Sequence, residues 1–544
     1  MKNIDVLHNY FGHSSFLDIQ EEVIDNLIIN KRNTLCLMPT GGGKSIIYQV
    51  AGLQSGKVTI IISPLIALMK QQKKYLDDKK LIAIHYNSCI GDLKAQYNFL
   101  KKTFKSEKMP HFFFVSPEKI FSDGYLEFII KQNVSKIGLV VIDEVHCISQ
   151  WGHTFRPTYK TIPYFLKNVF GEVNRPPILC LTATLNPKDE QEILKDLKIE
   201  KKDVFRSKFL LRDNLNLNIE NQAEDNTEKK EQLVEILNKH KNEKVIVYTH
   251  IKAREYGTRE MAKTFNELGF NCNFFDADLK ETEKLPVIDQ FISGAINIIF
   301  ATSAFGMGID IKDIRAVVHF LIPESIEQYY QEIGRAGRDN KVANGYLLHS
   351  ETNFKVRRDL IKSSLITKKR IEDIFRNAIA ESDDLSLFDS NRIHHLSRMD
   401  ISEDNSELIV FVMLLEFEAI EMLGKGILFT ECFENITNND TFNNYDQITS
   451  RKIVTLIAKR LLISPQQVIH NLYKMFDENQ IELKRSPINV LYYKLTKQLD
   501  SELAQKIHLA LKEKVENRLL GLEKLSKLIN GNFDPNTVIK QHLL

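Results

Sequence analysis

The sequence has few cysteines, and they are spread along the chain. The six are Cys36, Cys89, Cys147, Cys180, Cys272 and Cys432. No two of them are close enough to form a Cys-x-x-Cys pair, the spacing that supplies thiolates to most cysteine-ligated zinc sites. We therefore expect neither a disulfide framework nor bound zinc.

Long apolar runs and an excess of charge of one sign are also missing. The sequence contains no run of about 18 apolar residues and opens without an apolar signal segment. We therefore expect a reduced, cytoplasmic protein that does not contact a membrane. The formal net charge is +2, so any nucleic-acid surface must be a local concentration of lysine and arginine. A length of 544 residues suggests three or four domains.

The most informative stretch is a glycine-rich turn between a short apolar run and a helix-compatible run. It reads Met38-Pro39-Thr40-Gly41-Gly42-Gly43-Lys44-Ser45. Glycines let backbone amides approach phosphate oxygens at the start of a helix. Lys44 would add a positive charge and the Ser45 hydroxyl a ligand for Mg²⁺. The stretch predicts an ATP site with Thr40, Gly41, Gly42 and Gly43 among its contacts.

Two acidic residues form a second candidate site. Asp143 and Glu144 follow the apolar run of residues 139–142, which reads as a buried strand. Phosphoryl transfer needs one acid that helps to hold Mg²⁺ and another that polarises the attacking water. We assign the first role to Asp143 and the second to Glu144. Adjacent acids at a strand end are common by chance, so this assignment depends on the lysine-bearing loop upstream.

Two further apolar runs end in polar residues. Residues 58–62 lead into Ser63 and Pro64, and residues 178–181 lead into Thr182 and Thr184. In a parallel sheet with helices on both faces, ligands meet the loops at the carboxyl ends of the strands. These residues are therefore placed to touch a partner. As isolated segments they fit ordinary strand-ending turns equally well.

A second α/β segment repeats the pattern. Strands are expected at residues 244–249 and 296–302, and the later stretch 331–338 reads Gln-Glu-Ile-Gly-Arg-Ala-Gly-Arg. Its two arginines, Arg335 and Arg338, are three residues apart, so both can reach one triphosphate across a cleft. Arg338 is the better candidate for an arginine finger. A solvated basic face is the usual alternative for paired arginines.

These motifs resemble those of RecQ-family DNA helicases of superfamily 2 over residues 11 to about 350. The loop variant Pro-Thr-Gly-x-Gly-Lys-Ser is typical of superfamily 2, and residues 149–159, Ser-Gln-Trp-Gly-His-x-Phe-Arg-Pro-x-Tyr, resemble the aromatic-rich loop of the RecQ family. The resemblance implies an α/β fold of two tandem RecA-like P-loop lobes with ATP and Mg²⁺ in the cleft between them. It also implies translocation on single-stranded DNA and 3′-to-5′ unwinding of duplex DNA in recombination or repair. Two alternatives stay open: an RNA helicase, and a nucleic-acid-stimulated ATPase that remodels complexes without separating strands.

The same resemblance assigns roles to single residues of this chain. Gln20 occupies the adenine-reading place, although the family's arginine and aromatic residue are Leu17 and His13 here. His146 and Gln331 join the catalytic set, and Asp310 joins the nucleotide-binding set. DNA contact, or its coupling to hydrolysis, falls to Ser63, Pro64, Trp151, Phe155, Arg156, Thr182 and Thr184.

We predict five segments: lobe 1 at 1–208, lobe 2 at 209–350, a mixed helical connector at 351–444, a winged-helix-like module at 445–499 and C-terminal helices at 500–544. The basic residues between 355 and 370 fit either a phosphate-contacting surface or a solvated helix. The module is expected from two helices and a hairpin of residues 481–483 and 490–493, and it binds duplex DNA or acts as a scaffold. The C-terminal helices lack the cysteines of the RecQ zinc module, which makes the chain atypical for that family. No protein partner is indicated.

Overall fold

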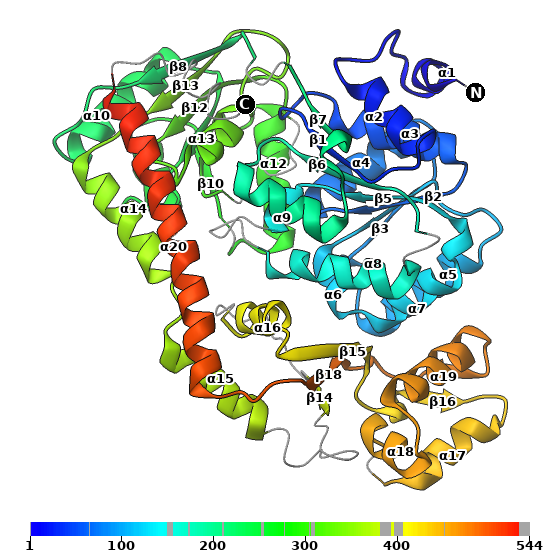
Figure 1. Cartoon of the computed structure of the whole chain (residues 1–544). Helices are drawn as coiled ribbons and strands as arrows, with labels where there is room; N and C mark the ends of the chain where they lie inside the picture. Colours follow the sequence, from blue (N-terminus) through cyan, green and yellow to red (C-terminus); the bar gives the residue numbers. More distant parts are fainter. Residues whose placement is uncertain are drawn as a thin grey trace.

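Two parallel sheets and a smaller module make up the chain. The computed structural model describes residues 2–64, 66–148, 156–171, 175–208, 212–251, 255–276, 278–303, 305, 311–380, 393–395, 406–450 and 452–531. Figure 1 shows lobe 1 in blue and cyan beside lobe 2 in green, with the orange module below lobe 1.

Lobe 1 is built on a seven-stranded parallel sheet in the order β3-β4-β2-β5-β6-β1-β7. Helices lie on its two faces (Figure 1), so its central strands are buried and read as continuous apolar runs in the sequence. The strands are β1 (Thr34–Leu37), β2 (Val58–Ile62), β3 (Ala83–Tyr86), β4 (Phe112–Val115), β5 (Ile137–Ile142), β6 (Ile178–Thr182) and β7 (Val204–Arg206). The main helices are α2 (Gln20–Ile28), α3 (Lys44–Ser55), α4 (Ile66–Asp78), α5 (Leu93–Lys105), α6 (Pro117–Ser122), α7 (Gly124–Gln132), α8 (Ile162–Phe170) and α9 (Pro187–Leu197).

Lobe 2 repeats this plan with a six-stranded parallel sheet in the order β10-β11-β9-β12-β13-β8. The strands are β8 (Leu215–Ile219), β9 (Lys244–Tyr248), β10 (Cys272–Phe275), β11 (Ile298–Ala301), β12 (Ile314–His319) and β13 (Ala343–Leu347). The helices are α10 (Asn226–Lys239), α11 (Thr258–Glu267), α12 (Glu281–Ser293) and α13 (Ile326–Ile333). The boundary predicted between residues 208 and 209 falls between β7 and β8.

The C-terminal region leaves lobe 2 and returns to it. Helices α14 (Glu351–Ser363), α15 (Lys368–Ala380) and α16 (Ser406–Glu416) lead away, and the long helix α20 (Ser501–Asn530) runs back along lobe 2 (Figure 1). The second half of α20 buries Leu522, Leu525 and Leu528 in the core of lobe 2. Arg518 of α20 donates to the Glu324 carboxylate at 2.9 Å. The last described helix is therefore an integral part of lobe 2. Across the described residues, no helix is long and apolar enough to span a bilayer.

The module contains both predicted helices, but the predicted hairpin is wrong. The predicted helices are α18 (Val454–Leu461) and α19 (Pro465–Asp477), and a further helix, α17 (Asp440–Ile448), precedes them. Strand β17 (Ile481–Leu483) pairs with β16 (Phe433–Asn435), whereas β18 (Asn489–Leu495) pairs with β15 (Ile420–Ile427) and β14 (Ile393–His395). Strand β18 is the central strand of its sheet, with β14 on one edge and β15 on the other, so no edge is free for β17. The two strands therefore belong to different sheets.

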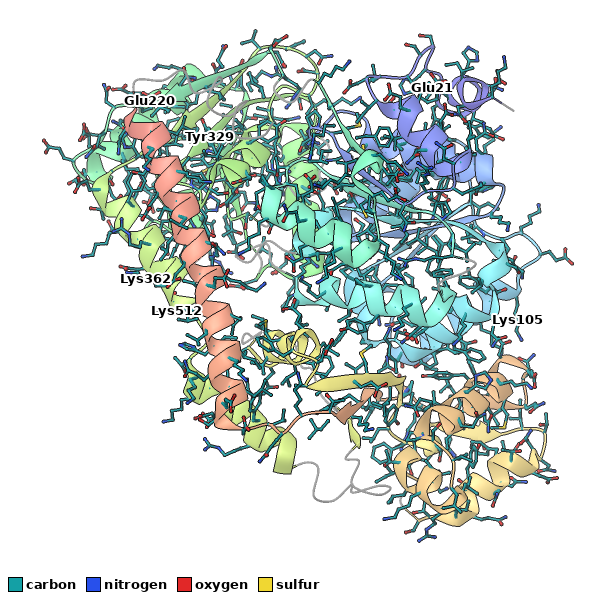
Figure 2. All side chains as sticks on the ribbon, in the orientation of Figure 1. Glu21, Lys105, Glu220, Tyr329, Lys362 and Lys512 are labelled. Carbon is teal, nitrogen blue, oxygen red and sulfur yellow. The ribbon has the colours of Figure 1, made fainter. Side chains whose placement is uncertain are left out.

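The module is fixed to lobe 1 by an aromatic cluster. The rings of Tyr97 and Tyr125 in lobe 1 stack with centroids 4.8 Å apart, and Tyr473 of α19 meets Tyr125 edge-on at 5.4 Å. Lys105 of lobe 1, labelled above the module in Figure 2, lies 3.5 Å from the Asp477 carboxylate at the end of α19. Helix α19 thus packs on lobe 1 as well as on its own module.

One residue of the basic stretch is not on the surface. Arg357 of α14 is fully buried, and its Nε donates to the Ile322 carbonyl at 2.8 Å. Arg357 therefore fits neither interpretation of the basic stretch, because it is neither part of a phosphate-contacting surface nor on a solvated helix face. Lys362, farther along the same helix, is exposed and labelled at the surface in Figure 2.

Candidate active site between the two lobes

The strand order of lobe 1 brings distant residues to one place. Strands β2, β5, β6 and β1 are neighbours in that order, and all are parallel. The carboxyl ends of parallel strands lie at the same edge of a sheet. Ser63, Asp143, Thr182 and the phosphate loop each follow one of these strands or end it. They therefore meet at that edge.

The phosphate loop has the predicted strand, turn and helix. Buried β1 leads into it, and α3 begins at Lys44 with Gly43 as its N-cap. Gly41 and Gly43 have φ angles of 83° and 81°, a left-handed conformation that favours glycine. The Lys44 ammonium donates to the Met38 carbonyl at 3.3 Å, so it lies across its own loop. Thr40, Gly42 and Ser45 complete the turn.

Gln20 holds the end of this loop. Its amide nitrogen donates to the Gly43 carbonyl at 3.1 Å, and its amide oxygen accepts from the Leu17 N–H at 2.9 Å. The side chain is buried. Gln20 therefore lies beside the phosphate loop, where its amide already has two partners, and the adenine contact stays a prediction.

The two acids occupy the strained end of β5. Glu144 has a φ of 49°, a left-handed conformation that is uncommon for residues other than glycine. Its N–H donates to Asp143 Oδ1 at 3.0 Å, and the Ser63 hydroxyl donates to Asp143 Oδ2 at 3.4 Å. The Tyr159 hydroxyl donates to the Asp143 carbonyl at 2.9 Å. This network fixes the Asp143 carboxylate and the backbone of both acids at the end of β5.

The surroundings of the two acids shift their pKa values in opposite directions. Burial, together with the charge of Glu144, raises the pKa of Asp143 to about 7. Burial also acts to raise the pKa of Glu144, but the nearby charges of Lys44 and the two lobe 2 arginines outweigh it and lower that pKa below its ordinary value. Glu144 is therefore ionised at neutral pH, as a group that polarises water must be.

His146 connects the acid pair to neighbouring segments. Its Nδ1 lies 3.0 Å from the Thr182 hydroxyl and 3.3 Å from a Glu144 carboxylate oxygen. Burial lowers the pKa of His146, which favours the neutral ring. The Thr182 hydroxyl in turn donates to the Thr184 carbonyl at 2.9 Å. Thr182 and Thr184 are thus buried elements of a hydrogen-bonded chain that starts at the acid pair.

Lobe 2 supplies its predicted residues to the same cleft. The Gln331 amide nitrogen of α13 lies 3.5 Å from His146 Nε2. A Cβ atom placed on Gly41 would meet Arg338 Cγ at 3.6 Å, so the Arg338 side chain lies over the phosphate loop. The charges of Arg335 and Arg338 both reach Glu144, as its lowered pKa shows. The two lobes therefore share one site.

Sequence reasoning missed the residues that hold the arginine segment. Arg212 donates to the carbonyls of Gly334 and Ala336 at 2.6 and 2.8 Å. Asn214 donates to the Gly337 carbonyl at 2.8 Å. Arg212 and Asn214 precede β8, far from Arg338 in sequence. In the sequence, Arg212 and Asn214 stand out only as two polar residues at the start of the second lobe, and no local pattern predicts their contact with the arginine segment.

The residues predicted to contact DNA fall into three groups. The first group, Trp151 and Phe155, lies outside the described residues. The same holds for Asp310, which was predicted to bind nucleotide. Arg156 is described, and its guanidinium donates to the Glu118 carboxylate at 2.8 Å. Ser63, Pro64, Thr182 and Thr184 are buried. DNA contact stays a prediction for every member of this set.

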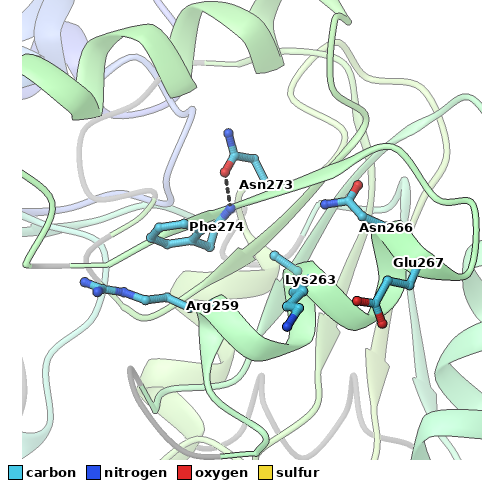
Figure 3. Close-up of a pocket in the computed structure, with 7 residues that line it drawn as sticks. Arg259, Lys263, Asn266, Glu267, Asn273 and Phe274 are labelled. Carbon is cyan, nitrogen blue, oxygen red and sulfur yellow. Dashed lines mark hydrogen bonds between the residues drawn. The ribbon is translucent and has the colours of Figure 1, made fainter.

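A separate hollow opens on lobe 2, away from these residues. It has a volume of about 520 Å³ and lies between α11 and β10 (Figure 3). Its lining includes Arg259, Lys263 and Phe274, and the guanidinium of Arg259 lies 5.3 Å from the centre of the Phe274 ring. Arg259 also donates to Asp276 at 3.1 Å. None of the predicted site residues lines this hollow.

Comparisons with known proteins identify both lobes. A DEAD/DEAH box helicase family model matches residues 17–193, and a helicase conserved C-terminal domain model matches residues 228–340. The chain is 36% identical over 376 residues to the ATP-dependent DNA helicase RecQ of Bacillus subtilis, which covers 68% of this chain and 60% of that protein. It is 30% identical over 426 residues to the probable ATP-dependent DNA helicase RecS of the same organism, covering 77% of this chain and 81% of the relative.

Solved structures show the same fold. The helicase Lhr of Mycobacterium smegmatis, bound to single-stranded DNA and AMP-PNP, superposes with a TM-score of 0.51 at 15% identity. The match covers 68% of this chain and 53% of that one. This likeness confirms the expected architecture of two RecA-like lobes. The chain spans about 60% of the length of the RecQ relative above.

Proposed function

Because this chain belongs to the RecQ family of superfamily 2 helicases, we propose that it is an ATP-dependent DNA helicase. It hydrolyses ATP, translocates on single-stranded DNA and unwinds duplex DNA in the 3′-to-5′ direction. Its place is in the cytoplasm, in recombination or repair. The single observation that carries the ATPase assignment is the composite site, in which Gln331 and Arg338 of lobe 2 lie against His146 and Gly41 of lobe 1.

The residues of this site divide the work of phosphoryl transfer. Lys44 and the loop amides bind the phosphates, and ionised Glu144 polarises the attacking water. Arg338, assisted by Arg335, stabilises the charge that develops on the transferred phosphoryl group. Because both arginines belong to lobe 2, hydrolysis depends on the closure of the two lobes.

The acid pair and the phosphate loop fit Mg²⁺. Burial and the charge of Glu144 raise the pKa of Asp143 to about 7 despite the nearby Lys44, so a further cation would stabilise the ionised carboxylate, and carboxylate and hydroxyl oxygens are ligands that Mg²⁺ prefers. Asp143 and Ser45 would hold the ion. When bound, it supplies positive charge that neutralises the phosphates.

A second candidate function is remodelling of nucleic-acid complexes without strand separation. The turn between β17 and β18 is anchored to lobe 1: the Ser486 hydroxyl donates to the Asp92 carboxylate at 2.5 Å, and the Tyr97 hydroxyl donates to Asn489 at 2.8 Å. A turn held in this way does not project as a wedge between two strands. This observation favours the second candidate over a helicase that uses this turn as its wedge.

A strand-displacement assay distinguishes these functions. The full chain is incubated with ATP and Mg²⁺ on duplexes that carry a 3′ tail or a 5′ tail, made of DNA or of RNA. We expect displacement of 3′-tailed DNA only, and none by Glu144→Gln, which keeps the size of the side chain and removes its charge. DNA-stimulated ATP hydrolysis without displacement of any duplex would support the remodelling function. Displacement of RNA alone would contradict the DNA assignment.

A further inference from the structure

Three side chains that bind metals in proteins meet in the core of lobe 2. His319 is the last residue of β12, His250 follows the neighbouring strand β9, and Glu332 lies on α13. One ligand atom from each lies within 4.8 Å of the others. Their exposed fractions are 7% for His250, 0% for His319 and 3% for Glu332. Two imidazoles and a carboxylate therefore meet in a buried part of lobe 2.

One carboxylate oxygen of Glu332 faces both imidazole rings. Glu332 Oε2 lies 2.7 Å from His319 Nε2 and 3.4 Å from His250 Nε2. The other oxygen accepts a hydrogen bond from the Gln328 amide at 3.0 Å. The Tyr248 ring stacks on both imidazoles with centroids 5.5 Å away. A hydrogen bond to the ligating carboxylate and fixed ring planes are the supports that metal ligands have in proteins.

An ordinary buried ion pair leaves part of this cluster without partners. The contact between Glu332 and His319 uses one ring nitrogen. His250 Nε2 makes only a longer contact of 3.4 Å with the same oxygen, and among the described residues His250 Nδ1 and His319 Nδ1 have no hydrogen-bond partner. Leaving buried polar atoms unpaired costs about 1–3 kcal/mol each. A cation between the three side chains would engage His250.

The surrounding charges permit such a cation. The Glu332 carboxylate faces both rings, so its negative charge would attract a cation to the space between them. The guanidinium of Arg357 also faces the cluster, since its charge acts on His250 and Glu332. It donates to the Ile322 carbonyl at 2.8 Å and lies 3.8 Å from the Glu324 carboxylate, which offsets only part of its charge because Glu324 also pairs with Arg518 at 2.9 Å.

We propose that His250, His319 and Glu332 form a metal site in lobe 2 for a divalent transition ion of the zinc class. Two histidines and one glutamate are a known zinc ligand set, with bond lengths of about 2.0–2.2 Å. The expectation of no zinc considered cysteine ligands alone, and these three residues are far apart in sequence. A bound ion would join β9 and β12 to α13, the helix that carries Gln331 into the cleft.

Metal analysis of the full chain tests the proposal. The protein is produced without a histidine tag, purified without chelators and analysed for bound metal. Zinc is then titrated into stripped protein while the melting temperature is recorded, and cobalt is used as a coloured substitute. We expect one ion per chain, a zinc-dependent rise in melting temperature and a visible cobalt spectrum. Glu332→Gln and His250→Asn should each weaken zinc binding by at least about 100-fold.

A matched control comes from the same lobe. His240 is also buried, and its nitrogens lie 2.7 Å from Glu243 and 3.0 Å from the Tyr346 hydroxyl. His240→Asn should leave zinc binding unchanged. Wild-type protein that contains no metal, shows no cobalt band and gains no stability from zinc would overturn the proposal, and it would identify the cluster as a buried ion pair. These measurements on the wild-type protein test the metal site even if a variant fails to fold, and they do not depend on helicase activity.

Discussion

The amide nitrogen of Gln331 lies 3.5 Å from Nε2 of His146, and this contact joins lobe 2 to a histidine that lies 3.3 Å from the Glu144 carboxylate of lobe 1. A neutral His146 ring can accept from Gln331 on Nε2 and donate from Nδ1 to the Thr182 hydroxyl at 3.0 Å. Thr182 ends β6, the strand next to β1 and its phosphate loop. A movement of α13 therefore changes hydrogen bonds at the ATP site directly.

The first prediction concerns the arginine that lobe 2 places over the phosphate loop. Arg338→Ala should leave ATP binding nearly unchanged, because Lys44 and the loop amides lie in lobe 1. It should slow hydrolysis by roughly 10³-fold or more, since the charge that stabilises the transition state is lost. Steady-state ATPase assays and titration with a fluorescent ATP analogue measure the two effects. Arg376→Ala is the control, because that side chain is 68% exposed and pairs with Asp373 on the same helix. Near-normal hydrolysis by Arg338→Ala would contradict the finger assignment.

The second prediction follows from the raised pKa of Asp143. This pKa is about 7 in the folded chain against an ordinary value of 3.8, so the unfolded chain loses this proton at lower pH. Folding stability should therefore fall as pH rises from about 4 to about 7 and then level off. Asp143→Asn cannot ionise, and its advantage in stability over wild type should grow across the same window. Chemical denaturation of nucleotide-free protein without Mg²⁺, repeated between pH 4 and 8, measures this advantage. A constant difference at every pH would show that Asp143 is not the titrating group.

Much of the site could be predicted because its signals are local. The phosphate loop, the acid pair after β5 and the arginines after α13 each lie within one short stretch. Each follows an apolar run or a helix whose pattern is set by burial. The strand order that brings them together follows from the RecA-like architecture implied by the family motifs.

The parts that could not be predicted depend on contacts between distant segments. Strand β18 pairs with β15, about 70 positions earlier in the chain, so the short spacing between β17 and β18 was a misleading signal. Arg357 reads as a surface charge, yet its carbonyl partner Ile322 lies in another segment. The proximity of His250 and Glu332 could not be predicted either, because no local sequence pattern indicates that two strands and a helix meet at one point.

The third prediction tests the packing of α20 on lobe 2. Leu525 is fully buried in the lobe 2 core, whereas Leu520 on the same helix is 54% exposed. Leu525→Ala should lower the free energy of unfolding by about 2–5 kcal/mol, because it removes buried methyl groups and leaves a cavity. Leu520→Ala should change it by no more than about 0.5 kcal/mol. Urea denaturation of both variants measures the difference. Equal effects would mean that α20 does not share the core of lobe 2.

The fourth prediction uses the single tryptophan of the chain, Trp151, as a reporter of the aromatic-rich stretch. Single-stranded DNA should change its fluorescence, because bases stack on aromatic and arginine planes. Phe155→Ala and Arg156→Ala should keep the ATPase activity measured without DNA. Stimulation by DNA and unwinding should fall together, and DNA affinity should fall less, since contacts to the phosphate backbone supply most of it.

Glu118 provides the control for this prediction, because its carboxylate accepts the hydrogen bond from Arg156 at 2.8 Å. Glu118→Gln removes the charge of that partner and keeps its size. If Arg156 acts on DNA, Glu118→Gln should retain or increase DNA stimulation, whereas Arg156→Ala should lose it. If Arg156 serves only to anchor its own segment to α6, both substitutions should reduce stability and DNA stimulation alike. Melting temperatures and DNA-stimulated ATPase rates of the two variants, measured side by side, separate a contact with nucleic acid from a purely structural ion pair.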